Sequence, residues 1–337
     1  MTSRFARLPR VDPSIAPAAA RVLVCGAGGF IGGHLVERLL AIGHRVRAVD
    51  IRPLEAWHQI RVEAENLSLD LRKADDCRAA VEGAEAVYNF ASDMGGIGFI
   101  ERNRAECMVN VLINTHLLLA AKDAAVNRYF FASSACVYRQ DLQAEGAAAL
   151  READAYPAMP EDGYGWEKLF GERMCRNFSE DFGLPTRVAR FHNVYGPHGT
   201  WRGGREKAPA AICRKVLEAL RSGDHRIEIW GDGTQARSFT YIEDAIDGVL
   251  AVMGSDLDEP VNVGSSRLVT IDELVDVVER VDGVKLRRTY HSQEPRGVMS
   301  RNSDNTLIKS RLGWEPGTAL EDGIERTYRW IAGEMSR

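Results

Sequence analysis

The chain has 337 residues, of which 45% are hydrophobic and 27% charged, so it can form one large domain or two fused ones. Its formal net charge is −5, which argues against the basic face of a nucleic-acid-binding protein. No segment approaches the roughly 20 consecutive apolar residues of a membrane span. We therefore expect neither nucleic acid nor a membrane among its partners.

Six cysteines are dispersed along the chain, and neither they nor the histidines cluster at metal-binding spacing. We therefore expect no metal site and no disulfide framework, and the thiols are typical of a reduced, cytoplasmic protein. The first 20 residues carry three arginines but lack the apolar core of a secretory signal. We predict that residues 1–20 form a disordered tail.

Short apolar runs alternate with segments of helical periodicity through the first 191 residues. Strands that alternate with helices and are apolar throughout are typical of a parallel sheet covered on both faces. The sequence therefore predicts an α/β fold with a Rossmann-type, doubly wound parallel sheet. The predicted strands are 21–25, 45–50, 66–71, 86–91, 128–133 and 186–191, and the predicted helices are 30–42, one ending near 82, 100–124 and 164–182.

The character of the sequence changes after Tyr195, where glycine and proline become frequent and the periodic segments become short. Such a composition favours an irregular lobe with many turns. We predict a first domain over 21–195, with a later return near 239–265, and a smaller substrate lobe that occupies most of 196–337.

A glycine-rich turn joins the first predicted strand to the first predicted helix. Gly26, Gly29 and Gly32 would let backbone N–H groups, including those of Phe30 and Ile31, approach a pyrophosphate at the helix N-terminus. Asp50 ends the next strand, 18 residues after Gly32, where a carboxylate accepts hydrogen bonds from the adenosine ribose. The first domain is therefore predicted to bind NAD rather than NADP, although Arg52 nearby weakens that preference slightly.

Tyr164 and Lys168 are four residues apart and share one face of a predicted helix. Tyrosine is a poor base at its ordinary pKa of about 10, but a lysine cation and a positively charged nicotinamide ring would lower that pKa. Tyr164 could then take a hydroxyl proton while hydride leaves for the nicotinamide. Ser134, at the end of the fifth strand, would hold the same oxygen. A surface tyrosine and lysine without a shared task are the alternative.

These segments together resemble the extended short-chain dehydrogenase/reductase family of nucleotide-sugar enzymes. Six longer strings are similar to its GDP-mannose 3,5-epimerase branch, and the resemblance runs from about residue 20 to the C-terminus. The strings are Ala91-Ser-Asp-Met-Gly-Gly-Ile-Gly-Phe99, Ser133-Ser-Ala-Cys-Val-Tyr138, Arg190-Phe-His-Asn-Val-Tyr-Gly-Pro197, Gly199-Thr-Trp-Arg-Gly-Gly-Arg-Glu-Lys-Ala-Pro209, Gly231-Asp-Gly-Thr-Gln-Ala-Arg-Ser-Phe239 and Arg301-Asn-Ser-Asp-Asn305.

The resemblance implies an epimerase in which C4 of a hexose is transiently oxidised. The ketone acidifies C3 and C5, so that a base on one face and an acid on the other can invert these carbons through an enolate. It assigns those roles to Cys136 and Lys207, whereas a buried apolar thiol and a solvated charge are the alternatives. Related dehydratases carry an acidic pair where Ala135 and Cys136 stand, so dehydration is disfavoured.

The resemblance also suggests where the ligands bind. We expect further cofactor contacts from Asp70, Leu71 and Ala91, and a close approach of the sugar at Met94 and Gly95. Arginine suits bidentate phosphate contacts. The expected substrate contacts are completed by the cations Lys215, Arg237 and Arg301, by the polar residues Asn193 and Gln235, and by Glu206 next to Lys207.

The leading prediction is thus an NAD-dependent epimerase of GDP-mannose that acts at C3 and C5. One alternative is an epimerase of another GDP-linked sugar that inverts a single centre at C3, C4 or C5. A non-catalytic NAD-binding regulator is a further alternative, which the intact catalytic set argues against. Relatives of this kind commonly form homodimers through two long helices, and we expect 100–124 and 163–182 to serve here.

Overall fold

The computed structural model describes residues 20–293 and 297–337. The predicted N-terminal tail, apart from Ala20, lies outside the described residues. Ala20 itself is buried, and its carbonyl accepts a hydrogen bond from the backbone N–H of Arg45 at 3.1 Å. Ala20 thus lies against the start of the second strand.

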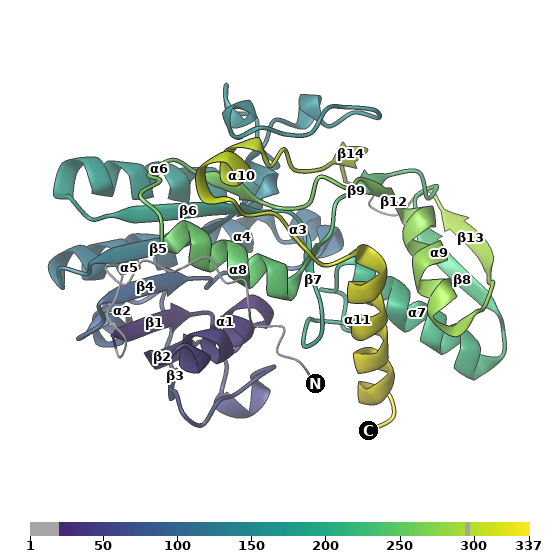
Figure 1. Ribbon diagram of the computed structural model, residues 1–337, viewed down its shortest axis with the longest axis horizontal. Coiled ribbons are helices and arrows are strands. Elements are labelled where there is room, and N and C mark those ends of the chain that lie inside the picture. Colours follow the sequence, from purple (N-terminus) through teal and green to yellow (C-terminus); the bar gives the residue numbers. More distant parts are fainter. Residues whose placement is uncertain (1–19, 294–296) are drawn as a thin grey trace.

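Seven parallel strands form the central sheet, in the order β11-β6-β5-β4-β1-β2-β3 (Figure 1). The part β3-β2-β1-β4-β5-β6 is the strand order of a doubly wound dinucleotide-binding sheet. The predicted α/β class and parallel sheet are confirmed. The strands are β1 (Arg21–Cys25), β2 (Arg45–Asp50), β3 (Glu65–Ser68), β4 (Ala86–Asn89), β5 (Arg128–Ser134), β6 (Thr186–Phe191) and β11 (Val261–Val263).

Helices cover both faces of this sheet because alternate strand residues point to opposite sides. In β1, Val22 and Val24 join one core cluster, whereas Leu23 and Cys25 join another. Burial of each such aliphatic side chain contributes about 1.5–3 kcal/mol. Helices α1 (Phe30–Ala41) and α8 (Ile242–Met253) pack together on the first side, and α2 (Ala74–Val81), α5 (Val111–Asp123) and α6 (Tyr164–Phe182) cover the second.

The segment predicted as one helix over 100–124 is divided into three, so that prediction is wrong. The helices are α3 (Ile97–Arg102), α4 (Arg104–Val109) and α5. Asn103 has non-helical dihedral angles. The side chain of Asn110 bonds the loop after β4. The Asn110 amide donates to Ser92 Oγ at 3.0 Å and accepts from the backbone N–H of Asp93 at 2.9 Å. These long-range bonds anchor the loop after β4.

A smaller lobe lies beside the carboxyl ends of the strands, to the right in Figure 1. Helices α7 (Ala208–Ser222), α9 (Ile271–Asp282) and α11 (Leu320–Glu334) pack on one another. Within the described ranges, no helix is both long and apolar enough to cross a membrane. The remaining elements are β7 (Val194–Tyr195), β8 (Arg226–Trp230), β9 (Ala236–Arg237), β10 (Thr240–Tyr241), β12 (Val269–Thr270), β13 (Arg287–His291), β14 (Ser300–Arg301), α10 (Thr306–Leu312) and the short 3-10 turns Leu54–Ala56, Ala135–Val137, Gln140–Leu142 and Glu152–Ala155.

Candidate active site

A cleft of about 750 Å³ opens beyond the carboxyl ends of β1 and β4. Strand order reverses between these two strands, which is where doubly wound sheets bind ligands. All of the predicted cofactor contacts line the cleft, and four predicted substrate or catalytic residues line it with them. The lining residues predicted from the sequence are Gly26, Gly29, Phe30, Ile31, Gly32, Asp50, Asp70, Leu71, Ala91, Met94, Gly95, Ser134, Tyr164, Lys168 and Lys207.

The glycine turn after β1 has the shape that a pyrophosphate requires. Gly26 has a φ of +77°, and a Cβ on Gly32 would lie 2.2 Å from the Gly26 carbonyl oxygen. No side chain caps the start of α1, so the first N–H groups of the helix remain available to an anion, which the helix dipole also favours. These residues therefore fit the diphosphate of a dinucleotide.

Asp50 stands at the end of β2 with a cation beside it. Arg52 Nε donates to Asp50 Oδ1 at 3.0 Å, and the backbone N–H of Arg52 donates to the same oxygen at 3.1 Å. An ionised carboxylate has about four acceptor positions, so Asp50 can still accept a ribose hydroxyl. Arg52 thus orients the carboxylate while reducing its negative charge at this end of the cleft.

Tyr164 is the first residue of α6 and lies almost fully buried beside the ends of β5. Burial raises the pKa of its phenol above the ordinary value, and Cys136 and Glu167 act in the same direction. A hydrogen bond from the Ser134 side chain partly opposes this effect. Ser134 thus lies within hydrogen-bonding reach of Tyr164, and its contact with the substrate hydroxyl stays a prediction.

Lys168 lies one helical turn after Tyr164, but its ammonium has two other neighbours. Nζ is 4.9 Å from the centre of the Phe131 ring and 3.5 Å from Glu167 Oε2, whereas the Tyr164 ring centre is 5.5 Å away. The sequence analysis did not include Glu167, a buried carboxylate whose pKa is raised by burial despite the opposing effect of Lys168. In this arrangement burial, not the lysine charge, dominates the titration of Tyr164.

Cys136 follows Ser134 in a 3-10 turn and packs with Tyr164, Ile100 and Cys107. Its backbone N–H donates to Ser134 Oγ at 3.2 Å. Burial raises the pKa of the thiol to about 11, and Glu161 contributes to this rise. The thiol therefore lies beside the Tyr164 phenol.

Lys207 reaches the same region from the start of α7. Burial lowers the pKa of its ammonium, Cys136 opposes that effect, and Arg301 adds to it. Residues far apart in sequence thus bring a thiol and an amine to one part of the site. The pKa of the thiol is raised and that of the amine is lowered, so both shifts favour the uncharged forms. A lowered pKa makes the neutral form of the amine more accessible to proton transfer.

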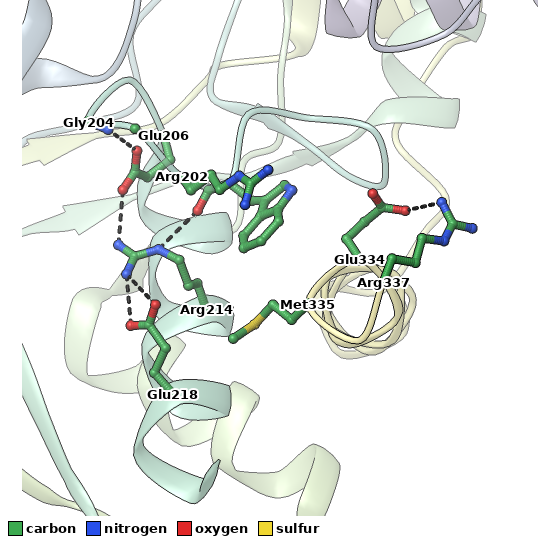
Figure 2. Close-up of a pocket in the computed structure, with 10 residues that line it drawn as sticks. Arg202, Gly204, Glu206, Arg214, Glu218, Glu334, Met335 and Arg337 are labelled. Atoms are coloured by element: carbon green, nitrogen blue, oxygen red, sulfur yellow. Dashed lines mark hydrogen bonds and ion pairs between the residues drawn. The ribbon is translucent and has the colours of Figure 1, made fainter. Parts of the chain in front are cut away.

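Glu206 does not turn toward the cleft with Lys207. Its carboxylate accepts from Arg214 Nη2 at 3.0 Å and from the backbone N–H of Gly204 at 2.7 Å, and it lines a second pocket on the outer surface (Figure 2). Arg214 also donates to the Trp201 carbonyl at 3.0 Å. The Arg214 guanidinium therefore binds both ends of the segment 201–206. It thereby holds in place the segment that leads to Lys207, the residue before α7.

The other predicted substrate contacts fall into two groups and one separate residue. Arg301 and Arg237 lie near Cys136 and Glu161, where burial lowers the pKa of Arg237 to about 10. Lys215 and Gln235 lie in the smaller lobe and bond backbone carbonyls of β8. Lys215 donates to the Glu228 carbonyl and Gln235 to the Trp230 carbonyl, each at 2.8 Å. Asn193 donates to the Ser238 carbonyl at 3.1 Å. None of these five residues lines the cleft of the described chain.

Sequence reasoning missed Glu161 and Trp230. Glu161 forms a buried ion pair with Arg301, and its position three residues before Tyr164 was the available signal. Trp230 has an exposed fraction of 41% and lies near both Lys215 and Gln235. The Gln235 Oε1 atom is buried without a hydrogen-bond partner among the described residues. This group therefore offers an aromatic surface next to an unused acceptor.

Comparison with known proteins identifies the chain's family. The model of the NAD-dependent epimerase/dehydratase family matches residues 22–264, which is more than half of the chain. The chain belongs to this family. The resemblance found in the sequence is thereby confirmed, as are the predictions that the protein is an enzyme and that its cofactor is NAD.

Within the NAD-dependent epimerase/dehydratase family, plant proteins are close relatives. GDP-mannose 3,5-epimerase 1 of Oryza sativa subsp. japonica is 45% identical over 318 residues, covering 94% of this chain and 83% of that protein. GDP-mannose 3,5-epimerase of Arabidopsis thaliana is 44% identical over 319 residues, covering 94% and 83%. The crystal structure of UDP-glucose 4-epimerase with UDP-glucose from Thermotoga maritima has a TM-score of 0.84 at 24% identity, covering 94% of this chain and 99% of that one. This last likeness shows the shared fold.

Proposed function

We propose that this enzyme epimerises a GDP-linked sugar and that the sugar is GDP-mannose, inverted at C3 and C5. The observation that carries the proposal is the meeting of Cys136 and Lys207 beside Tyr164. A hydride-transfer site alone needs no second proton-transferring pair. The two plant relatives bear the name of the same reaction and match 94% of this chain.

The first part of the reaction takes place at the carbinol. NAD held by the glycine turn and Asp50 would supply the hydride acceptor for C4 of the sugar and the donor for its re-reduction. Tyr164 takes the proton of the C4 hydroxyl and later gives it back, while Ser134 holds the same oxygen through a hydrogen bond. The burial of Tyr164 excludes water from this exchange.

The second part inverts the neighbouring carbons. The C4 ketone acidifies the protons at C3 and C5, and the planar enolate can be reprotonated from the opposite face. Cys136 and Lys207 are the proposed proton-transferring groups because a thiol and a buried amine can both change protonation state during the cycle. Return of the hydride then leaves no net oxidation.

Dehydration, the other reaction in the family name, requires an acid to protonate a leaving hydroxyl. Glu161 is a buried carboxyl near Cys136, but it is a poor candidate for that acid. Burial raises the pKa of Glu161, whereas the Arg301 guanidinium outweighs burial and holds that pKa below its ordinary value. An ionised carboxylate has no proton to donate, so epimerisation is the better proposal.

The nucleotide end of the substrate is proposed to lie along the smaller lobe. The exposed Trp230 ring can stack on a base, and Gln235 Oε1 is an acceptor suited to the N–H groups of guanine. Arg237 and Lys215 are the proposed positive charges for the diphosphate. We retain Met94 and Gly95 as the proposed contacts of the sugar.

The proposed reaction can be tested by incubating the enzyme with GDP-mannose in deuterated water. We expect deuterium to enter C3 and C5, because each carbon is deprotonated and then reprotonated from exchangeable groups. NMR of the recovered sugar locates the label. Label at one carbon alone would favour the single-centre alternative, and label at neither carbon would refute the proposal for GDP-mannose.

We propose that two copies of the chain associate through α4, α5 and α6. Seven large apolar side chains on these helices are exposed by more than a third, which is unusual for a free surface. We expect light scattering to give the mass of a dimer and Phe170→Glu to shift it toward the monomer. A monomeric wild-type enzyme would contradict this proposal. The seven residues are Met108, Val109, Leu112, Leu119, Trp166, Phe170 and Phe182.

We propose the cytoplasm as the compartment. All six cysteines are free and buried, and reduced thiols are typical of a reducing compartment. Cell fractionation should therefore recover the enzyme with cytoplasmic proteins, and recovery with secreted proteins would contradict the assignment.

A further inference from the structure

Cys136, Arg301 and Glu161 form one buried cluster beside Tyr164. Each of the three is only 8% exposed. Arg301 Nη1 lies 3.6 Å from Cys136 Sγ, Arg301 Nη2 forms an ion pair with Glu161, and Nε donates to Gln143 Oε1 at 2.5 Å. Three donors of one planar guanidinium thus have three different acceptors, which leaves its orientation little freedom.

Glu161 is also linked to Cys136 through the main chain. The backbone N–H of Glu161 donates to the Cys136 carbonyl at 3.0 Å, so the two residues keep their spacing through the main chain. Arg301 comes from β14, 165 residues after Cys136. The thiol therefore lies beside an ion pair whose positive and negative members come from separate parts of the chain.

We propose that Arg301 and Glu161 form an opposed pair of charges that sets the protonation state of the Cys136 thiol. Arg301 stabilises the thiolate, whereas Glu161 favours the thiol and holds Arg301 in place. Glu161 is thus a positioning residue that acts through its two neighbours. The proposal rests on the proposed function for the use of this proton, but the effect of the charges on the thiol requires no substrate.

The other groups near the thiol come from four elements. They are Tyr164 of α6, Cys107 of α4, Lys207 at the start of α7 and Arg237 of β9. Burial is the largest influence and raises the thiol pKa, Glu161 raises it further, and Arg301 and the Ser134 hydroxyl lower it. In a low-dielectric interior, charges at such distances change a pKa strongly. The two members of the pair therefore act with opposite signs.

This pair also changes the expected role of Arg301. The sequence analysis expected Arg301 to grip the diphosphate, but its three donors are directed at the side chains of Cys136, Gln143 and Glu161. The carboxylate of Glu161 cancels most of the attraction that the Arg301 guanidinium would exert on a more distant phosphate. We therefore assign Arg301 to the proton chemistry at Cys136 and leave the diphosphate to other cations.

The test is the alkylation rate of Cys136 in the NAD-containing enzyme as a function of pH. The probe is iodoacetamide, and the mass of the modified peptide separates Cys136 from the other five cysteines. Glu161→Gln is expected to lower the midpoint of the rate profile by about 1–3 pH units, and Arg301→Gln to raise it by a similar amount. The double variant should return toward the wild-type midpoint.

Asp162→Asn is the matched control, since it removes a carboxylate next to Glu161 whose side chain is 65% exposed. Solvent screens that charge, so we expect the midpoint to stay unchanged. An unchanged or raised midpoint in Glu161→Gln would overturn the proposal. If Arg301→Gln fails to fold because Glu161 is left unpaired, the Glu161→Gln and double variants still decide. No sugar is used, so failure of GDP-mannose to exchange deuterium would leave this result intact.

Discussion

Replacement of Tyr164 by phenylalanine is expected to lower kcat for GDP-mannose epimerisation by about 10²- to 10⁴-fold, the usual contribution of a general acid or base. The change removes only the oxygen that exchanges a proton with the C4 hydroxyl. The ring remains and continues to fill its buried position beside Cys136. The NAD content of the purified enzyme and its melting temperature should therefore change little, and kinetic assays should show the loss in kcat.

Tyr88→Phe provides the control for this experiment. Tyr88 is also a buried tyrosine, but it belongs to β4 and packs in the core against Phe130 rather than lining the cleft. Its variant is expected to retain wild-type kcat. Equal activity losses in the two variants would indicate a general effect of removing a buried phenol, and the catalytic assignment of Tyr164 would then be withdrawn.

Replacement of Cys136 by serine is expected to stop deuterium incorporation into the sugar and to lower kcat by about 10²- to 10⁴-fold. Serine has nearly the same size, but its hydroxyl is a far weaker acid than a thiol and cannot exchange a proton with a carbon at a useful rate. Tyr164 and the glycine turn are unchanged, so NAD should remain bound. NMR of the sugar and measurement of bound NAD separate these two effects.

Cys107→Ser is the matched comparison for Cys136→Ser. Cys107 is fully buried in the same small cluster, and its side chain also lies near Tyr164. We expect this variant to exchange deuterium as the wild type does. Normal exchange by Cys136→Ser would disprove its proposed role, and loss of exchange in both variants would indicate that packing of the cluster, not the thiol, is required.

The local parts of the site could be predicted from the sequence. A strand, a glycine turn and a helix start bring Gly26, Gly29 and Gly32 together over seven residues, and helical geometry puts Tyr164 and Lys168 on one face. The relative positions of the three glycines, and of Tyr164 and Lys168, depend on local backbone geometry that varies little between proteins. The alternation of strands and helices predicted the parallel sheet for the same reason.

Charged partners were harder to predict, because a side chain's charge does not specify which opposite charge it meets. Arg301 was expected at a phosphate, yet it pairs with Glu161, 140 residues earlier. Glu206 was expected at the substrate, yet it bonds Arg214 in the second turn of the next helix. Lys168 was expected to lower the pKa of Tyr164 together with the nicotinamide ring, whereas in the protein alone burial is the largest influence and raises that pKa.

The sequence by itself thus determined the sheet, the cofactor turn and the tyrosine–lysine spacing, because these depend on contacts within a few residues and on the apolar pattern. Only the tertiary structure decided where Asn110 interrupts the helical segment, which carboxylate meets Arg301, and that Cys136 lies beside this ion pair. The first feature depends on the loop after β4, which Asn110 bonds, and the other two depend on how β14 packs against the ends of the strands. Desolvation in that contact, and not residue type, then determines which groups hold their protons.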